Sequence, residues 1–432
     1  MTPPTKSKPV FDGAKLSPKL KPKADESRVE IPLPIGKASG AGGVGVARAY
    51  KHAAGKSDTY AVEVVDMIYH MAREGPFSEP YVGEFVAAKL SAEQDASHLP
   101  MEATWDHLVF LSANLTRLVI DPYRERCNSL VEIGPNRARP LTLKWPIVFS
   151  GVDFGRLSKP LMEYVDAASV QAGLATTVGS DGPSLHGAKI IAVDVSDPQL
   201  DGLVNAEAIE LTASHVSQLN RSVIGPVLAS VRNSTHAKIP IGVVAPAIGA
   251  ESVVDETVDL DIDFFVADGQ WTDERCPTEI FPELSGAPAI HVLADTVERL
   301  RHHCREHVIQ VIYRGGIRSG ADAGKALCLG ATAVSLGLSA VVGMGFKITK
   351  IEGPAELIKQ LSAPIEAEDA TRQVYNFAKS VNMEVTMLAR ACGKSSVTNM
   401  EPEDLRALNP AVSAATGVPV AGKDFNFRHV TH

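Results

Sequence analysis

The chain has 432 residues, 45% of them hydrophobic and 22% charged, which is typical of a globular protein with one large domain or two ordinary ones. Its formal net charge of -9 argues against a nucleic-acid partner, because proteins that bind nucleic acid usually carry a basic face. No apolar run approaches the roughly 20 residues of a membrane span, and the N-terminus shows no apolar secretion signal. We therefore expect a cytoplasmic protein with no membrane partner.

Residues 1–57 are predicted to form a flexible arm. Lysine and proline are frequent up to about residue 30, and few residues there can be buried. A glycine-rich stretch with Gly40, Gly42, Gly43 and Gly45 follows. It is only loosely similar to a phosphate-binding loop, because no predicted strand precedes it, and a flexible linker is favoured.

Residues 58–140 are predicted to form a helical segment that leads into the next domain. Within it, "DTYAVEVVDMIYHMAREG" (58–75) carries apolar residues at helical spacing and ends in Gly75, a common helix stop. The remainder mixes short apolar runs with turn signals.

From residue 141 to residue 345, short β-branched runs alternate with helical segments. This pattern predicts an α/β fold, a parallel (βα)8 TIM-type barrel. The eight predicted strands lie near 146–152, 174–179, 208–211, 241–246, 263–269, 288–294, 308–316 and 332–337. Residues 346–432 are predicted to be a C-terminal helical extension, with helices at 354–363, 368–393 and 401–408.

The predicted loop after strand seven is typical of an anion site. In such barrels the active site lies at the carboxyl ends of the strands, and phosphate commonly sits after strands seven and eight. Gly315 and Gly316 allow close approach of backbone N–H groups, and the helix that starts near Gly320 adds a favourable dipole. Arg318 adds charge, and Gly337 after strand eight supplies a second backbone donor. The alternative is a tight turn whose glycines serve packing only.

The stretch "GGIRSGADAGKALCLGATAVSLGLSAVVGMG" (315–345) resembles the FMN-phosphate segment of the glutamate synthase family. The similarity extends to "WDHLVFLSANLTRLVIDPYRERCNSLVEIG" (105–134), "PIVFSGVDFGRLSK" (146–159) and "ARACGKSSVTNMEPEDLRALN" (389–409), and it covers roughly residues 60–425. Within the family, the last segment is closest to the large FMN-binding subunit of N-methylglutamate synthase.

The resemblance implies an FMN-binding barrel and an FMN-dependent transfer of an amino group, from ammonia or methylamine, with oxidoreduction on glutamate or 2-oxoglutarate. It implies a role in nitrogen metabolism and assembly with glutaminase-like and β-helical subunits or with an intact paralogue. No iron–sulfur cluster is expected, because the closely spaced cysteines of full-length glutamate synthases are absent after Gly345, and no metal site is predicted from the five scattered cysteines.

Several positions depart from the family pattern on the phosphate and flavin side. The loop after the first strand keeps Gly151 but places Asp153, a carboxylate, where the resemblance puts the flavin ring; Arg156 is available to pair with it. After strand eight, Leu338 replaces the usual threonine that follows the glycine, so that the backbone donor is kept and the hydroxyl is lost. These changes weaken the expected FMN site.

The substrate side departs further. Val244 stands at the position of the family's lysine, and valine supplies no cation. The glycine-rich loop after the strand at 208–211 is missing. Asp268 remains near the ring, but it is followed by Trp271, Asp273 and Glu274 in place of a glycine run. Asp268, Asp273 and Glu274 form either a new acidic site or a solvated turn.

Histidines offer two further candidates. His291 is predicted to end strand six at the barrel mouth, where it acts as a general acid or base or is simply packed. The run "HHCREH" (302–307) places His303 and His307 four residues apart, but solvated polar residues on an outer helix are favoured over a metal site.

Three functions remain open. The first is FMN-dependent catalysis with Asp153, Asp268 and His291 as catalytic candidates. The second is a non-catalytic barrel that acts as a scaffold or regulatory subunit of an oligomer, which the loss of pocket residues favours. The third is a pocket adapted to a different ligand.

Overall fold

A computed structural model describes ten stretches of the chain, all of them in the compact unit that begins at Ala47. The described residues are 62–75, 103–113, 118–121, 125–150, 159–180, 186–200, 202–270, 289–345, 369–423 and 425–428. The predicted arm at 1–57 and the predicted helix at 354–363 lie outside them.

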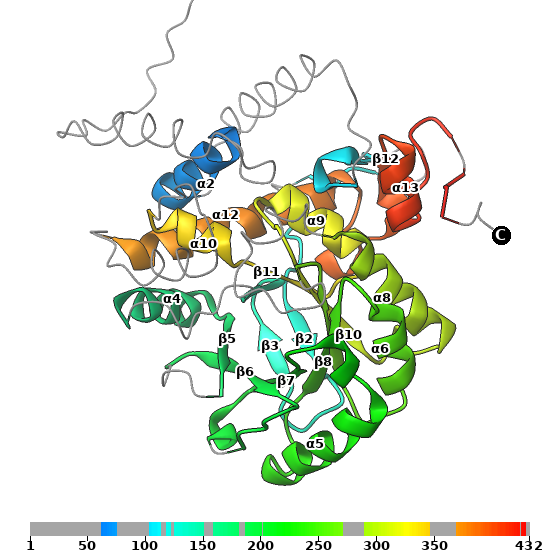
Figure 1. The fold of residues 1–432 in the computed structure, drawn as a ribbon. Coiled ribbons are helices and arrows are strands. Elements are labelled where there is room, and N and C mark those ends of the chain that lie inside the picture. Colours follow the sequence, from blue (N-terminus) through cyan, green and yellow to red (C-terminus); the bar gives the residue numbers. More distant parts are fainter. Residues whose placement is uncertain are drawn as a thin grey trace, which may run out of the picture. The chain divides into compact units, whose positions relative to one another are not determined.

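Eight parallel strands close into a barrel, which confirms the predicted fold class (Figure 1). In chain order they are β4 (Ile147–Phe149), β5 (Ala175–Gly179), β6 (Ala188–Asp194), β7 (Ala208–Thr212), β8 (Ile241–Pro246), β9 (Phe264–Asp268), β10 (Gln310–Arg314) and β11 (Ala333–Ser335). Their residues are almost all buried, as expected for strands that are covered by helices on the outside and by one another's side chains on the inside.

One predicted strand was wrong and one was missed, although the count of eight was right. The segment 288–294 runs into helix α8 (His291–His302), whose buried residues Val292, Val297 and Leu300 recur at helical spacing. The missed strand is β6, which carries Lys189 near its start. The runs at 208–211, 241–246 and 263–269 are therefore strands four, five and six.

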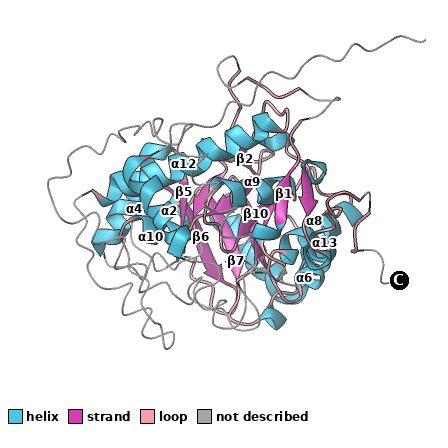
Figure 2. Ribbon diagram, turned by 90° about the horizontal axis from the view of Figure 1, so that it is seen from above, coloured by secondary structure: helices cyan, strands magenta, loops and turns pink. Residues whose placement is uncertain are grey.

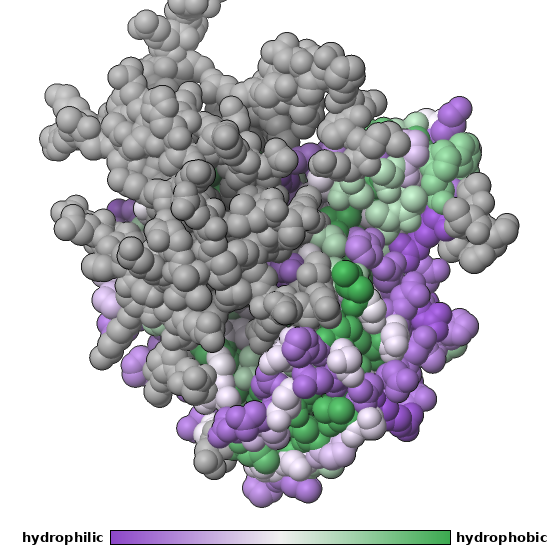
Figure 3. Space-filling view, viewed as in Figure 1, coloured by the Kyte–Doolittle hydropathy of each residue, from purple (hydrophilic) through white to green (hydrophobic). Residues whose placement is uncertain are grey.

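Helices surround the strands, as Figure 2 shows from above. Those of the barrel are α4 (Lys159–Ala172), α5 (Arg221–Ser234), α6 (Ala250–Thr257), α8, α9 (Gly320–Cys328) and α10 (Leu338–Gly343), with short 3-10 turns η3 (Leu203–Asn205) and η4 (Val216–Gln218). On the face seen in Figure 3 the described surface is mostly hydrophilic, with smaller hydrophobic patches. No helix among the described residues is long and apolar enough to cross a membrane.

The remaining described elements lie outside the barrel. They are α2 (Val62–Glu74), η1 (Trp105–His107), β1 (Leu108–Phe110), the hairpin β2 (Val131–Ile133) and β3 (Leu141–Leu143), α12 (Ala370–Ala391), η5 (Val397–Asn399), η6 (Pro402–Asp404), β12 (Leu405–Ala407) and α13 (Pro410–Thr416). The long helix α12 contacts α2, α4 and α9. It buries an apolar face that includes Val374, Phe377 and Val381.

Two predictions for these outer elements can be compared directly. The helix predicted at 58–75 is confirmed as α2, and Gly75 follows it with a positive φ of 75°. The helix predicted at 401–408 was wrong. Pro402 starts only one 3-10 turn, after which β12 pairs with β1 in antiparallel register, Leu108 opposite Ala407.

An ion-pair network secures the amino end of the barrel. Asp263, just before β9, accepts from Arg137 of the β2–β3 connection at 2.6 Å and from Arg232 of α5 at 2.6 Å, and from the backbone N–H of Ile241 at 2.8 Å. Both arginines also contact Asp261. Two cations thus face two carboxylates, so the network is electrically balanced.

We predict that Asp263→Ala lowers the free energy of unfolding by about 3–5 kcal/mol, because it leaves buried Arg232 short of its carboxylate. Asp261→Ala is the matched control: its side chain is 64% exposed, and a loss of under ~1 kcal/mol is expected. Denaturant unfolding measures both, and equal losses contradict this account.

Candidate functional site

The carboxyl-end mouth of the barrel holds a buried polar cluster. Arg314 is the last residue of β10 and is paired in register with Asp268, the last residue of β9. Residues that are paired on neighbouring strands share a face of the sheet. Because the guanidinium of Arg314 reaches Glu210 of β7 across the two intervening strands, this shared face is the barrel interior.

The guanidinium of Arg314 makes four hydrogen bonds there. Its Nη2 donates to both carboxylate oxygens of Glu210, at 2.9 and 2.7 Å, and its Nη1 donates to Asp268 at 3.2 Å. Its Nε donates to the hydroxyl of Ser150 at 3.0 Å. Ser335, at the end of β11, adds a hydrogen bond of 2.6 Å to the carbonyl of Ser150.

The charges of this cluster do not balance. One guanidinium faces two carboxylates, and all three side chains are 6% exposed or less. Burial alone lowers the pKa of Arg314, but Glu210 and Asp268 outweigh it and raise that pKa above its usual range. The guanidinium therefore stays charged, and the three groups carry a surplus of one negative charge when both carboxyls are ionised.

The family's lysine position lies on the same interior face. Val244 is paired in register with Val266 of β9, two residues before the Pro246–Asp268 pair, and it is 1% exposed. The positive charge expected from β8 is thus absent at this position. Arg314 brings a positive charge to the interior from β10 instead.

The loop after β10 has the backbone conformation expected of an anion-binding turn. Gly315 and Gly316 have φ values of 150° and 58°, both in the region that favours glycine. Trp105 of η1 covers this loop: its ring meets Tyr313 edge-on at 5.2 Å, and its Nε1 donates to the carbonyl of Gly315 at 3.5 Å. The 58–140 region is thus fastened to the candidate site.

Arg318 does not offer its charge to a ligand. Its guanidinium donates to Asp322 at 2.8 Å and to both carboxylate oxygens of Asp106 at 3.0 Å. Burial lowers its pKa, but the coulombic attraction of Asp322 and Asp106 raises the pKa well above its usual range overall. The expectation that Arg318 adds free positive charge to the anion site is therefore not met, because its partners are two protein carboxylates.

Gly320 serves close packing between helices. Its backbone N–H, at the start of α9, donates to a carboxylate oxygen of Glu384 in α12 at 2.7 Å. A Cβ on Gly320 would lie 2.5 Å from the backbone oxygen of Val381. A protein carboxylate thus occupies this N–H, in the place where a ligand anion was expected.

A hydroxyl missed by sequence reasoning lies after strand eight. Gly337 precedes α10 with a φ of -108°, and Leu338, the position of the family's threonine, is fully buried. The next residue is Ser339, also fully buried, whose hydroxyl has no hydrogen-bond partner among the described residues. The chain therefore carries a buried hydroxyl one position after that of the family's threonine, which a search for that threonine passes over.

Two further buried polar groups lack partners within the described ranges. Thr177 of β5 is paired in register with Ile190, which is paired with Ala208, two residues before Glu210, so it faces the barrel interior. The side-chain amide of Gln270 follows β9 and is 6% exposed. Unsatisfied buried polar groups are costly, so each is a candidate contact for a ligand.

His291 does not end a strand. It starts α8, and its Nε2 lies 3.0 Å from the carbonyl of Ala247, just after β8, with Asp295 at 4.0 Å. Its side chain is 43% exposed. The catalytic role predicted for it stays a prediction. Gly151, Asp153, Trp271, Asp273 and Glu274 lie outside the described residues.

The other predicted histidine cluster is a surface feature. Helix α8 ends at His302, so His303 and His307 do not share a helix face, and His303 instead contacts Asp255 of α6 at 2.8 Å. No group of metal-binding side chains occurs in the described part of the chain.

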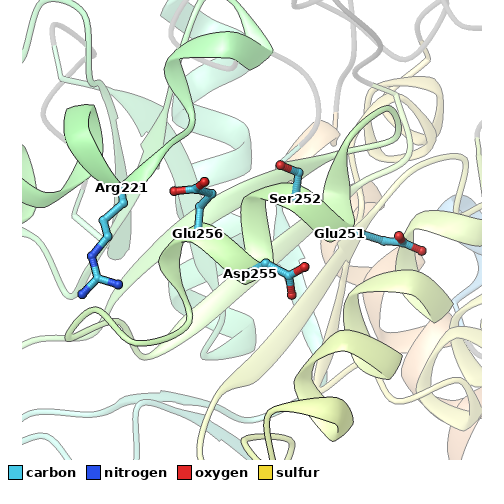
Figure 4. A pocket seen from close by; sticks show the side chains of 5 residues that line it. All are labelled: Arg221, Glu251, Ser252, Asp255 and Glu256. Atoms are coloured by element: carbon cyan, nitrogen blue, oxygen red, sulfur yellow. The ribbon is translucent and has the colours of Figure 1, made fainter.

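A surface pocket of about 520 Å³ lies on α5 and α6. It is lined by Arg221, Glu251, Ser252, Asp255 and Glu256, whose side chains are drawn in Figure 4.

Comparisons with known proteins bear on the same elements. The family model "FMN-dependent dehydrogenase" matches residues 284–368, which contain β10, β11 and their loops. A "glutamate synthase large subunit-like protein" of Rhizobium meliloti is 28% identical, over 74% of this chain and 87% of that protein. The chain is similar to FMN-dependent dehydrogenases and to glutamate synthase-like proteins.

A second glutamate synthase is less similar. An "archaeal glutamate synthase [NADPH]" of Methanocaldococcus jannaschii is 25% identical over 64% of this chain, which spans 60% of that relative's length. Among solved structures, a flavocytochrome b2 mutant with benzoylformate and a mandelate oxidase mutant with 2-hydroxy-phenylacetamide each give a TM-score of 0.50 at 16% and 18% identity. They cover 75% and 84% of this chain, and 80% and 98% of their own chains. At this identity they show the fold alone.

We predict that Gly320→Ala lowers the stability of this protein by about 1–3 kcal/mol, because the added Cβ meets the backbone of α12. Gly225→Ala in α5 is the matched control: open space surrounds it, and removing a helical glycine stabilises by roughly 0.5–1 kcal/mol. Opposite shifts in denaturant midpoint are expected, and a neutral Gly320→Ala contradicts the packing role.

Proposed function

We propose that the chain binds FMN at the carboxyl-end mouth of its barrel and uses it in oxidoreduction. The single observation that carries the proposal is the pairing of the left-handed glycines after β10 with the unpartnered, buried hydroxyl of Ser339 after β11. Both lie where a (βα)8 barrel binds phosphate. The match of residues 284–368 to FMN-dependent dehydrogenases supports the choice of FMN.

The residues present fit the phosphate end of FMN. The backbone of Gly315 and Gly316 and the hydroxyl of Ser339 would hold the phosphate, with the backbone of Gly337 beside them. Because Arg318 is neutralised by Asp322 and Asp106, this site depends on backbone and hydroxyl donors. Such neutral donors bind an anion less tightly than a free guanidinium does.

The interior side chains fit the flavin end. Thr177 and Gln270 have unpartnered polar atoms that suit the polar edge of a flavin. FMN, when bound, supplies two-electron chemistry. The protein's own residues orient it, and Glu210, Asp268 and the predicted Asp153 are the acidic groups available near it to hold or release a proton.

The finer proposal is amino-group transfer, from ammonia or methylamine, with oxidoreduction on glutamate or 2-oxoglutarate. The names of the relatives support it. The charge of the mouth opposes efficient use of 2-oxoglutarate, because the Glu210–Arg314–Asp268 cluster has a surplus negative charge. We therefore propose that this reaction is slow in the isolated chain.

The second candidate function is a non-catalytic scaffold or regulatory subunit. The observation that favours it is Arg314 itself, which crosses the interior and ties β10 to β7 and β9. We propose that either form works in an oligomer, with glutaminase-like or β-helical subunits or an intact paralogue, and the mass of the protein in cell extracts tests this.

We predict that the purified protein shows flavin absorbance or takes up added FMN, and that Ser339→Ala weakens FMN binding about tenfold. The same substitution is expected to stabilise the FMN-free protein, because it removes an unsatisfied buried hydroxyl. Opposite signs in FMN titration and thermal unfolding distinguish a ligand contact from a packing defect.

Gly316→Val, which forces a branched side chain into a left-handed position, is expected to abolish FMN binding. A colourless protein that does not bind added FMN contradicts the proposal and favours the non-catalytic scaffold.

We predict turnover below about 1 per second with FMN, a reductant, 2-oxoglutarate and ammonia or methylamine, a rate at the low end for enzymes. The reason is the missing cation at Val244 combined with the acidic surplus at Glu210 and Asp268. Product formation by the isolated chain measures it. Faster turnover restores the ordinary family activity.

A further inference from the structure

We propose that the Glu210–Arg314–Asp268 cluster sets the reduction potential of the flavin, with Arg314 as the charge that tunes it. The inference rests on the proposed function, because it requires FMN in the barrel mouth. It goes beyond that function by giving the cluster a defined physical effect on the cofactor.

Arg314 lies next to the proposed phosphate loop and contacts residues beside two other loops of the mouth. It immediately precedes Gly315 of the proposed phosphate loop. Its Nε donates to Ser150, which immediately precedes the loop that the family resemblance places at the flavin ring. Its Nη1 donates to Asp268, which precedes the loop after β9. One guanidinium therefore touches the ends of strands that lead into three loops of the mouth.

Arg314 and its two carboxylate partners are buried. Arg314, Glu210 and Asp268 are 4%, 1% and 6% exposed in their side chains, so water screens their charges poorly. The four hydrogen bonds of the Arg314 guanidinium also hold it in one place. A fixed, weakly screened charge acts on a neighbouring ring far more strongly than a solvated one.

The net charge of the cluster determines the direction in which each substitution shifts the reduction potential. Reduced flavin carries more negative charge than oxidised flavin, so nearby negative charge lowers the reduction potential and nearby positive charge raises it. The cluster has a net charge of -1 with both carboxyls ionised. Glu210→Gln brings it to 0, and Arg314→Met brings it to -2. The two substitutions are therefore expected to shift the potential in opposite directions.

The experiment is a reductive titration of the FMN-loaded protein against dyes of known potential. Glu210→Gln and Asp268→Asn, both close in shape to the native residues, are expected to raise the midpoint potential. Arg314→Met is expected to lower it. The expected size is about a tenfold change in the ratio of the two forms, which is about 30 mV for a two-electron couple.

Arg232→Met is the matched control. Arg232 is also a buried arginine that binds carboxylates, but it lies at the amino end of the barrel. It is expected to destabilise the protein without moving the potential. A merely structural role for Arg314 predicts the same result for Arg314→Met.

The outcomes separate the two proposals. If the native protein takes up no FMN, the proposed function fails and this inference fails with it. If FMN binds and its potential stays the same in Glu210→Gln and Asp268→Asn, this inference alone is overturned. These two variants decide the matter even if Arg314→Met does not fold.

Discussion

A buried guanidinium between two carboxylates determines how this barrel is built at its mouth. Arg314 reaches Glu210, Asp268 and Ser150, so one side chain joins the ends of β10 and β9 to the middle of β7 and to the residue after β4. Removing Arg314 leaves two carboxylates without a cation in a low-dielectric interior, which is costly. Apolar layers usually fill the interior of such barrels, and here a charged layer closes it instead.

Both ends of the barrel carry arginine–carboxylate ion pairs, but the net charge of the two clusters differs. At the amino end, Arg137 and Arg232 face Asp261 and Asp263, so the charges cancel. At the carboxyl end, one cation faces two anions, and the surplus acts on whatever occupies the mouth. The asymmetry coincides with the end at which barrels bind ligands.

The barrel, the glycine turn after β10 and helices α2 and α12 were predictable, because long periodic segments and glycine-rich turns are local signals. The strand predicted at 288–294 failed because a short apolar run does not distinguish a buried strand from the first turn of a helix. The roles of Arg314 and Arg318 depend on Glu210 and Asp106, which are about 100 and 200 residues away in the chain, so no local pattern reveals them. Ser339 was missed because its hydroxyl sits one position beyond the family's threonine.

The contact between Gly320 and α12 bears on where the chain can be divided. The N–H of Gly320 donates to Glu384, and the packing leaves no room for a side chain between the two helices. The helix after the proposed phosphate loop is thus attached to the C-terminal extension. The barrel therefore does not form a separable domain that ends at residue 345. A fragment that ends there lacks α12, which packs on α9, and the carboxylate of Glu384 that accepts from the N–H of Gly320. Shuffling this barrel into another protein requires that α12 travel with it.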